Sequence, residues 1–305
     1  MRVIVTGGTG LIGSKLVDKL VQKNYEVVVL SRNPQKYPAK NNVQYEKWDA
    51  KTAAGWGQLA DGAHAIINLA GESIGGEGFP PPRWTQERKD RILQSRLGAG
   101  HAVVEAIQNA EQKPKYLLQA SAIGFYGDRG SETLTESSSV GSGFLADVVK
   151  EWEASTASVE EAGVRRVSMR IGIVYTLEGG ALPATILPFR LFAGGPLGNG
   201  RQYISWVHVD DVVNAMMFLL ENENASGPIN ITGPEPLTNA QMAKVIGKVM
   251  KRPSFFPAPG FALKLALGET SNLVLHGQKV LPTKLTELGF QFEYKTAEKA
   301  LKELL

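Results

Sequence analysis

Short apolar, β-branched runs alternate with stretches of helical spacing along the first 170 residues. Runs such as VIV and VVVL are apolar on both faces, which is typical of a parallel sheet that helices cover on both sides. The pattern predicts strands at 2–6, 26–30, 43–46, 65–69, 116–120 and 164–170, and helices at 11–23, 85–110 and 143–162. We therefore expect an α/β fold whose parallel sheet is flanked by helices.

The alternation weakens after residue 175, where Gly- and Pro-rich pieces precede WVHVDDVVNAMMFLL, a predicted strand followed by an amphipathic helix. A length of 305 residues suits two domains, or one large unit with a smaller appendage. We expect residues 1–174, with a returning segment at about 203–232, to form the first domain. Residues 175–305 would mainly form a smaller C-terminal, substrate-side region. In the WVHVDDV motif we expect structural roles, with Asp210 capping the helix.

Composition excludes several classes of protein. The chain has no cysteine, and its four histidines fall in no metal-ligand spacing, so a metal site is not expected. The net charge of +3 is scattered, which argues against a nucleic-acid partner. Without a signal peptide or an apolar run of about 18 residues, we expect a cytoplasmic protein with no membrane partner.

Three glycines lie in the predicted turn between the first strand and the first helix. Gly7, Gly10 and Gly13 stand at GxxGxxG spacing, where a sharp turn lets a pyrophosphate approach the backbone and the helix N-terminus. An ordinary tight turn is the alternative. The predicted dinucleotide-binding residues here are Gly7, Thr9, Gly10, Leu11, Ile12 and Gly13.

The second predicted strand ends in Ser31-Arg32, where NAD-binding folds usually place an acidic residue. Arginine offers a planar cationic fork for a phosphate, and serine offers a hydroxyl donor. The pair therefore favours NADP(H) over NAD(H), although Arg32 as a solvated loop residue is the alternative.

Several motifs together resemble the extended short-chain dehydrogenase/reductase superfamily: TGGTGLIG, SR after the second strand, NLAG, ASAIGFYG and WVHVDDV. The segments RWTQERKDRILQSR, GFLADVVKEWEA and GQKVLPTKLTELGFQFEY are similar to its atypical epimerase-family proteins of family 39U, whose substrate is unknown. The resemblance implies a Rossmann-type doubly wound sheet that binds NADP(H). It also implies further cofactor contacts at Asp49, Leu69, Ala70, Gly71, Glu72 and Arg96; Asp49 as a surface turn residue is the alternative.

The superfamily uses a Tyr and a Lys four residues later for proton transfer. No tyrosine of this sequence has a lysine at that spacing. Aligning GFLADVVKEWEA with the family places Leu145 and Val149 at the two positions, and Ala122 where the catalytic serine usually lies. The catalytic candidates left are Ser121, Tyr126 and Lys150, although Tyr126 as core packing and Lys150 as a solvated residue are the alternatives.

The Gly- and Pro-rich, then basic, segment 75–91 suggests either a mobile lid whose arginines clamp an anionic substrate or a plain loop before a helix. One functional hypothesis is an NADP(H)-dependent oxidoreductase or epimerase acting on a small polar, possibly nucleotide-linked, substrate. The other is a non-catalytic NADP(H)-binding regulator with a protein partner, possibly related to cell division. A monomer and a homodimer are equally compatible with the sequence.

Overall fold

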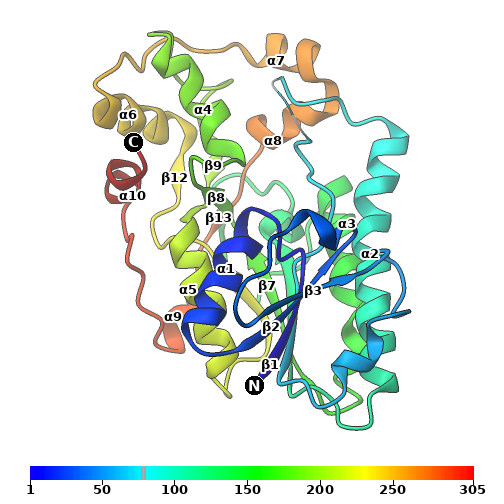
Figure 1. The fold of residues 1–305 in the computed structure, drawn as a ribbon. Coiled ribbons are helices and arrows are strands. Elements are labelled where there is room, and N and C mark those ends of the chain that lie inside the picture. Colours follow the sequence, from blue (N-terminus) through cyan, green and yellow to red (C-terminus); the bar gives the residue numbers. More distant parts are fainter. Residues whose placement is uncertain (77, 79) are drawn as a thin grey trace.

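A seven-stranded, wholly parallel sheet forms the centre of the computed structural model, which describes residues 1–76, 78 and 80–305. The strand order is β11-β7-β5-β4-β1-β2-β3, so the chain winds outward from β1 in both directions (Figure 1). The sheet strands are β1 (Arg2–Thr6), β2 (Glu26–Ser31), β3 (Val43–Lys47), β4 (Ala65–Asn68), β5 (Tyr116–Ala122), β7 (Arg165–Ile171) and β11 (Gly227–Ile231).

Helices cover both faces of this sheet because its side chains alternate between them. Val3 and Val5 of β1 pack with one layer of helices, whereas Ile4 faces the other layer. The first layer contains α1 (Leu11–Gln22) and α5 (Val209–Glu221), and the second contains α2 (Gln86–Asn109). The predicted α/β, Rossmann-type doubly wound architecture is confirmed.

Most of the remaining elements lie beyond the carboxyl ends of the strands, although two of the helices pack against the sheet itself, at β5 and β11 (Figure 1). A separate apolar core joins some of them, with Tyr175, Trp206, Met242 and Leu301 among its members. The helices are α3 (Phe144–Ala154), α4 (Ala181–Arg190), α6 (Asn239–Met250), α7 (Gly260–Leu267), α8 (Asn272–Leu275), α9 (Thr283–Glu287) and α10 (Ala297–Leu304). The short strands are β6 (Thr133–Leu134), β8 (Ile173–Tyr175), β9 (Tyr203–Ile204), β10 (Trp206–His208), β12 (Leu237–Thr238) and β13 (Lys279–Val280).

Single-turn 3-10 helices connect several of these elements. They are η1 (Pro34–Lys36), η2 (Gly57–Ala60), η3 (Ile123–Tyr126), η4 (Ala157–Val159) and η5 (Gly268–Ser271). Among the residues described, no helix combines the length and the apolar character needed to cross a bilayer.

The helix predicted over 143–162 is too long, because α3 ends at Ala154. The hydroxyl of Ser155 bonds back to the carbonyl of Trp152 at 2.7 Å, and the next residue begins the approach to η4. Gly100 of α2 lies so close to Ser155 that a Cβ there would stand 2.2 Å from its Oγ. The apolar pattern continues to Val159, but the helix ends at Ala154, where the chain packs tightly against α2.

The predicted cap of α5 is also corrected. His208, not Asp210, is the N-cap: its Nδ1 accepts the Asp210 amide at 3.1 Å, while its Nε2 lies 2.8 Å from Glu303. Asp211 is buried and accepts the amides of Glu293 and Tyr294 at 2.8 and 3.0 Å. The motif thus joins α5 to the C-terminal segment, in agreement with the expected structural role.

Candidate cofactor and substrate site

The glycine turn lies between β1 and α1 and leaves room above the helix N-terminus. Gly7 has a φ of +65°, and a Cβ there would stand 2.8 Å from the carbonyl of Leu69. A Cβ on Gly13 would stand 2.2 Å from the Gly7 oxygen, so Gly13 permits close packing of the helix on the turn. At Gly10, by contrast, a Cβ would meet nothing but the Gly7 oxygen, at 3.3 Å.

Gly10 is the N-cap of α1 and supplies no capping side chain. The first-turn amides, those of Leu11, Ile12 and Gly13, therefore lack a partner from the helix itself. These amides and the positive end of the helix dipole suit an anion. The residues fit a dinucleotide pyrophosphate, because the space that a Cβ would enter at Gly10 is open.

A chain of buried hydrogen bonds fixes the neighbouring turn after β4. The hydroxyl of Thr6 donates to Asn68 at 2.5 Å and accepts the amides of Leu69 and Ala70, each at 3.1 Å. Asn68 in turn donates to Gln119 of β5 at 2.8 Å. The chain holds the Leu69 to Gly71 turn, with its small residues, beside the glycine turn.

The end of β2 lies beside the glycine turn, since Leu30 pairs with Thr6 in the sheet. Ser31 is buried and accepts the amide of Asn33 at 3.2 Å, whereas Arg32 is exposed. Asp49, after β3, accepts the amides of Lys51 and Thr52, each at 2.8 Å. Slight burial works to raise the pKa of Asp49, but hydrogen bonds from Thr52 and Lys51 outweigh it and lower that pKa. The Asp49 carboxylate thus caps its own turn.

Arg96 of α2 lies directly against Gly71, at 3.3 Å from the position of a Gly71 Cβ. It is buried, donates to the carbonyls of Glu72 and Ile92 at 3.0 and 2.8 Å, and stacks on Trp152 at 4.8 Å. Burial lowers the pKa of Arg96 to about 10, so it is still a cation at neutral pH. Arg96 therefore brings a positive charge to the turn after β4.

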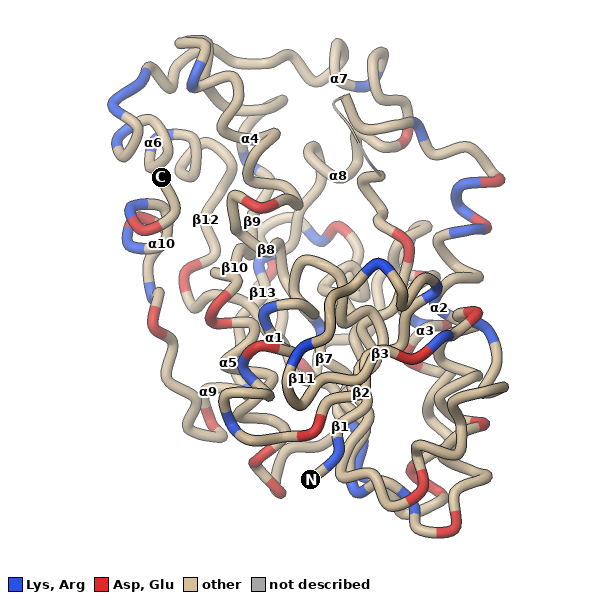
Figure 2. Tube along the Cα trace, in the orientation of Figure 1, with Lys and Arg blue, Asp and Glu red and all other residues tan. Residues whose placement is uncertain are grey.

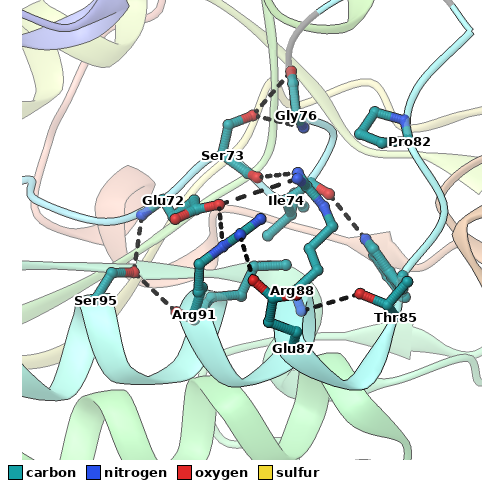
Figure 3. Close-up of polar contacts among 12 residues, drawn as sticks. Glu72, Ser73, Ile74, Gly76, Pro82, Thr85, Glu87, Arg88, Arg91 and Ser95 are labelled. Atoms are coloured by element: carbon teal, nitrogen blue, oxygen red, sulfur yellow. Dashed lines mark hydrogen bonds and ion pairs between the residues drawn. The ribbon is translucent and has the colours of Figure 1, made fainter.

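The Glu72 carboxylate is held between two arginines of α2 (Figure 3). Arg91 Nε lies 3.4 Å from Glu72 Oε1, and Arg88 Nη1 lies 4.0 Å from it. Arg88 also donates to the Ser73 carbonyl at 2.9 Å, and the Ser95 hydroxyl accepts the Glu72 amide at 2.9 Å. These contacts fasten the start of the 72–91 segment to α2.

The rest of that segment is fastened to the C-terminal region. Arg83 donates to the carbonyls of Leu265 and Ala266 at the end of α7, at 2.5 and 3.2 Å, and Lys89 pairs with Glu269. The amide of Trp84 donates to the Thr270 hydroxyl at 2.9 Å. In the described part of this segment, Arg83, Arg88 and Arg91, the arginines predicted to clamp a substrate, all bind protein groups, which favours the plain loop over the lid. Glu77 and Phe79 of the segment lie outside the described residues.

Apolar side chains fill the two positions at which the superfamily carries its catalytic Tyr and Lys. Leu145 and Val149 of α3 face η3, within 3.4 and 3.7 Å of where a Cβ on Gly124 would lie. Lys150 is on the exposed side of the same helix. The structure therefore does not bring Lys150 together with the other two catalytic candidates.

Ser121 and Tyr126 belong to one buried network centred on an ion pair. Glu153 of α3 accepts from Arg170 of β7 at 2.8 and 2.9 Å, and from the Ser121 hydroxyl at 2.6 Å. The Tyr126 hydroxyl accepts from Arg170 at 3.0 Å and donates to Asn230 at 2.7 Å.

Burial raises the pKa of Tyr126, against the opposing effect of Arg170. That direction is the reverse of what a general acid at neutral pH needs. Sequence analysis missed Arg170 and Asn230, although a cation inside the otherwise apolar run VSMRIGIV was a readable signal.

A pocket of about 460 Å³ opens where the loop after η3 meets the C-terminal region. Asp128 lies on one wall, and His276 faces it with Nδ1 3.9 Å from Asp128 Oδ2. The other lining residues are Gly198, Asn199, Gly260, Phe261, Lys264 and Leu275. The pocket thus combines an aromatic ring with cationic, acidic and amide groups. Among the residues described, no cluster of His, Asp and Glu could hold a metal ion.

Comparisons with known proteins agree with this geometry. The model of the NAD dependent epimerase/dehydratase family matches residues 3–232, and a domain of unknown function, DUF1731, matches residues 258–304. The chain is 40% identical to epimerase family protein YfhF of Bacillus subtilis over 306 residues, which cover 100% of the chain and 98% of that protein. It is 41% identical to the chloroplastic SDR39U1 homolog of Arabidopsis thaliana, over 100% of the chain and 87% of that protein.

A solved structure is similar over the whole chain. Human epimerase family protein SDR39U1 (isoform 2), solved with NADPH, has a TM-score of 0.87 and 32% sequence identity, covering 100% of this chain and 99% of that one. The family match covers both the glycine turn and the β5 to α3 corner. The chain belongs to the NAD dependent epimerase/dehydratase family, with full-length relatives of the SDR39U1 type.

Proposed function

We propose that the protein is an NADP(H)-binding oxidoreductase that lacks the usual Tyr-Lys pair and acts on a small polar molecule. The observation that carries the proposal is the uncapped N-terminus of α1 beneath the open space at Gly10. The NADPH in the structure of the human relative supports the same cofactor. The predicted cofactor residues Gly7 to Gly13, Leu69 to Glu72 and Arg96 would hold the pyrophosphate and the adjoining ribose.

Arg32 and Ser31 would select the phosphorylated cofactor. Arg32 is exposed just after the end of β2, next to the glycine turn, where a guanidinium suits a ribose phosphate. A carboxylate at this position would repel that phosphate, and none is present at 31 or 32.

The pocket that Asp128 and His276 line would receive the substrate. Its Lys264 and Asn199 suit an anionic or hydroxylated molecule, and Phe261 suits a ring. A bound nicotinamide would supply hydride exchange. The chain's own contribution would be to position the substrate, because Leu145 and Val149 cannot transfer protons and Tyr126 is buried.

The cofactor proposal is tested by titrating NADPH and NADH against wild type and Arg32→Ala, with cofactor fluorescence as the readout. We expect wild type to prefer NADPH by about tenfold or more, which is ~1.4 kcal/mol, and Arg32→Ala to lose most of that preference. Lys36→Ala is the matched control, since Lys36 is also exposed and follows the same strand. Equal wild-type affinities for the two cofactors would refute the selection by Arg32.

A specific observation favours a second candidate, a regulator that binds NADP(H) without turnover. The helix that carries the usual pair is intact, yet its two chemical positions are apolar and packed. A panel of nucleotide sugars and small carbonyl compounds with NADPH separates the two candidates. Turnover of any member supports the oxidoreductase; tight NADPH binding with no turnover across the panel supports the regulator.

A further inference from the structure

The large apolar side chains that are exposed gather mainly at one end of the molecule. Among the described residues, ten such side chains are exposed, and six of them come from three segments near the ends of α4, α6 and α7. Their exposed fractions run from 49% to 77%. We call this set the apolar cap: Leu191, Phe192, Phe255, Phe256, Phe261 and Leu265.

Backbone contacts join the segment after α4 to the segment between α6 and α7, which continues directly into α7. The Phe256 amide donates to the Gly194 carbonyl at 3.1 Å, and the Gly198 amide donates to the Ala258 carbonyl at 2.9 Å. The Arg252 guanidinium lies over the Phe192 ring at 4.3 Å. In Figure 1 the ends of α4 and α7 and the segment between α6 and α7 all lie along the upper edge, opposite the N-terminus.

The sequence around the apolar cap carries cations and no carboxylates. Residues 179–209 contain two arginines and no acid, and residues 236–268 contain five cations and no acid. Figure 2 shows blue segments along the tube at α4, α6 and α7. Arg190, Lys251 and Lys264 are exposed beside the apolar residues.

From this surface we propose that the apolar cap binds the surface of a bilayer that contains anionic phospholipids. Exposed Phe and Leu side chains beside Lys and Arg are the combination that partitions into the headgroup boundary of anionic membranes. The protein would lie on the membrane without crossing it. Scattered singly, such residues would need no partner, but here six of them gather at one end of the molecule.

Charge disfavours a second copy of the chain as the occupant. A two-fold symmetric contact would place two copies of the same surface face to face, so the cations Arg190, Lys251 and Lys264 of one copy would lie near those of the other and repel them. An anionic lipid surface instead attracts every one of these cations. The pocket shares Phe261 and Lys264 with this end of the molecule, so its rim would lie near the lipid.

The test is cosedimentation of the full chain with vesicles of phosphatidylcholine alone or of phosphatidylcholine mixed with phosphatidylglycerol. We expect binding to the anionic vesicles, weakened by salt, and about tenfold or more weaker binding without phosphatidylglycerol. Phe255→Ser with Phe256→Ser, and Arg190→Glu with Lys251→Glu, should each reduce binding by a similar factor. NADPH affinity and circular dichroism verify that each variant is folded.

Matched controls make the same kinds of substitution outside the apolar cap. Val140→Ser with Leu305→Ser removes two exposed apolar side chains outside the apolar cap, and Lys23→Glu with Lys295→Glu makes the same change in net charge. Both controls should bind vesicles like wild type. No binding of wild type to anionic vesicles would overturn the proposal, as would equal losses in the controls. Concentration-dependent self-association that Phe255→Ser with Phe256→Ser abolishes, without vesicle binding, would assign the patch to a second copy.

Discussion

The glycine turn after β1 and the corner formed by η3 and α3 lie at the same edge of one sheet but differ in what they offer a ligand. At the turn, a Cβ on Gly10 would meet a single atom, and the helix amides point into open space. At the corner, Leu145 and Val149 close over Gly124, and the Tyr126 hydroxyl already has two partners. One end of the site has the geometry for binding an anion, whereas the other end is filled by packed apolar side chains.

The largest expected effect breaks the packed corner. Arg170→Met leaves the Glu153 carboxylate half-buried without its cation and should destabilise the fold by about 3–5 kcal/mol. Urea denaturation followed by circular dichroism measures the change. The double variant Arg170→Met with Glu153→Gln should recover part of this loss, because no unpaired charge is left. A single variant as stable as wild type would show that the ion pair does not hold the corner.

The next effect breaks the open turn. Gly10→Val puts a branched side chain where the pyrophosphate would lie, so NADPH affinity should fall by about a hundredfold, or ~2.7 kcal/mol, while the fold persists. Gly10→Ala should retain more affinity because its methyl group is smaller. Gly13→Ala provides the contrast, since its Cβ would clash with the turn itself and should lower stability. Wild-type affinity in Gly10→Val would exclude the turn as the phosphate site.

The smallest effect sharpens the contrast by asking whether Tyr126 has a chemical role. Tyr126→Phe removes a hydroxyl that makes two buried hydrogen bonds, one from Arg170 and one to Asn230, and should cost about 1–2 kcal/mol of stability at neutral pH. Because burial raises the pKa of Tyr126 in the folded state, wild type should lose stability as the pH rises above about 10, where the unfolded tyrosine ionises first. The variant should lose less over that range.

Denaturation of both proteins across the alkaline range is the measurement. Any turnover with NADPH should change by less than about threefold in Tyr126→Phe and should show no neutral-pH limb from this residue. A loss of turnover near 100-fold, within the range of a general acid, would return Tyr126 to the catalytic candidates.

Sequence reasoning recovered six of the seven strands of the sheet, all but β11 (Gly227–Ile231), because burial on both faces gives each strand a recognisable apolar run. The first five predicted strands lie within a residue or two of β1, β2, β3, β4 and β5, and the helix predicted over 85–110 is α2 (Gln86–Asn109) with Thr85 as its cap. The glycine turn could be predicted for the same reason, since the spacing of its glycines and the strand and helix on either side all lie close together in the sequence.

The packed corner was not readable in this way. Arg170 lies 17 residues from Glu153 and 44 from Tyr126, and Asn230 lies 104 from Tyr126, so nothing local pairs them. The same holds for His208, whose Nδ1 caps α5 while Nε2 meets Glu303, 95 residues away. From one sequence, such residues can be recognised as polar positions within apolar runs, but their distant partners cannot be predicted.

The fastening of segment 80–89 to the C-terminal region has a consequence for synthesis of the chain. The Trp84 amide donates to Thr270, 186 residues later, and Arg83 donates to the carbonyls of Leu265 and Ala266. At about 5–20 residues per second, these partners leave the ribosome on the order of 10–40 seconds after the segment that needs them. Over that interval strands β1 to β5, five of the seven in the sheet, are synthesised and can assemble, whereas the chain leading into α2 does not have its final contacts. The start of α2 is therefore among the last parts of the nascent protein to become fixed.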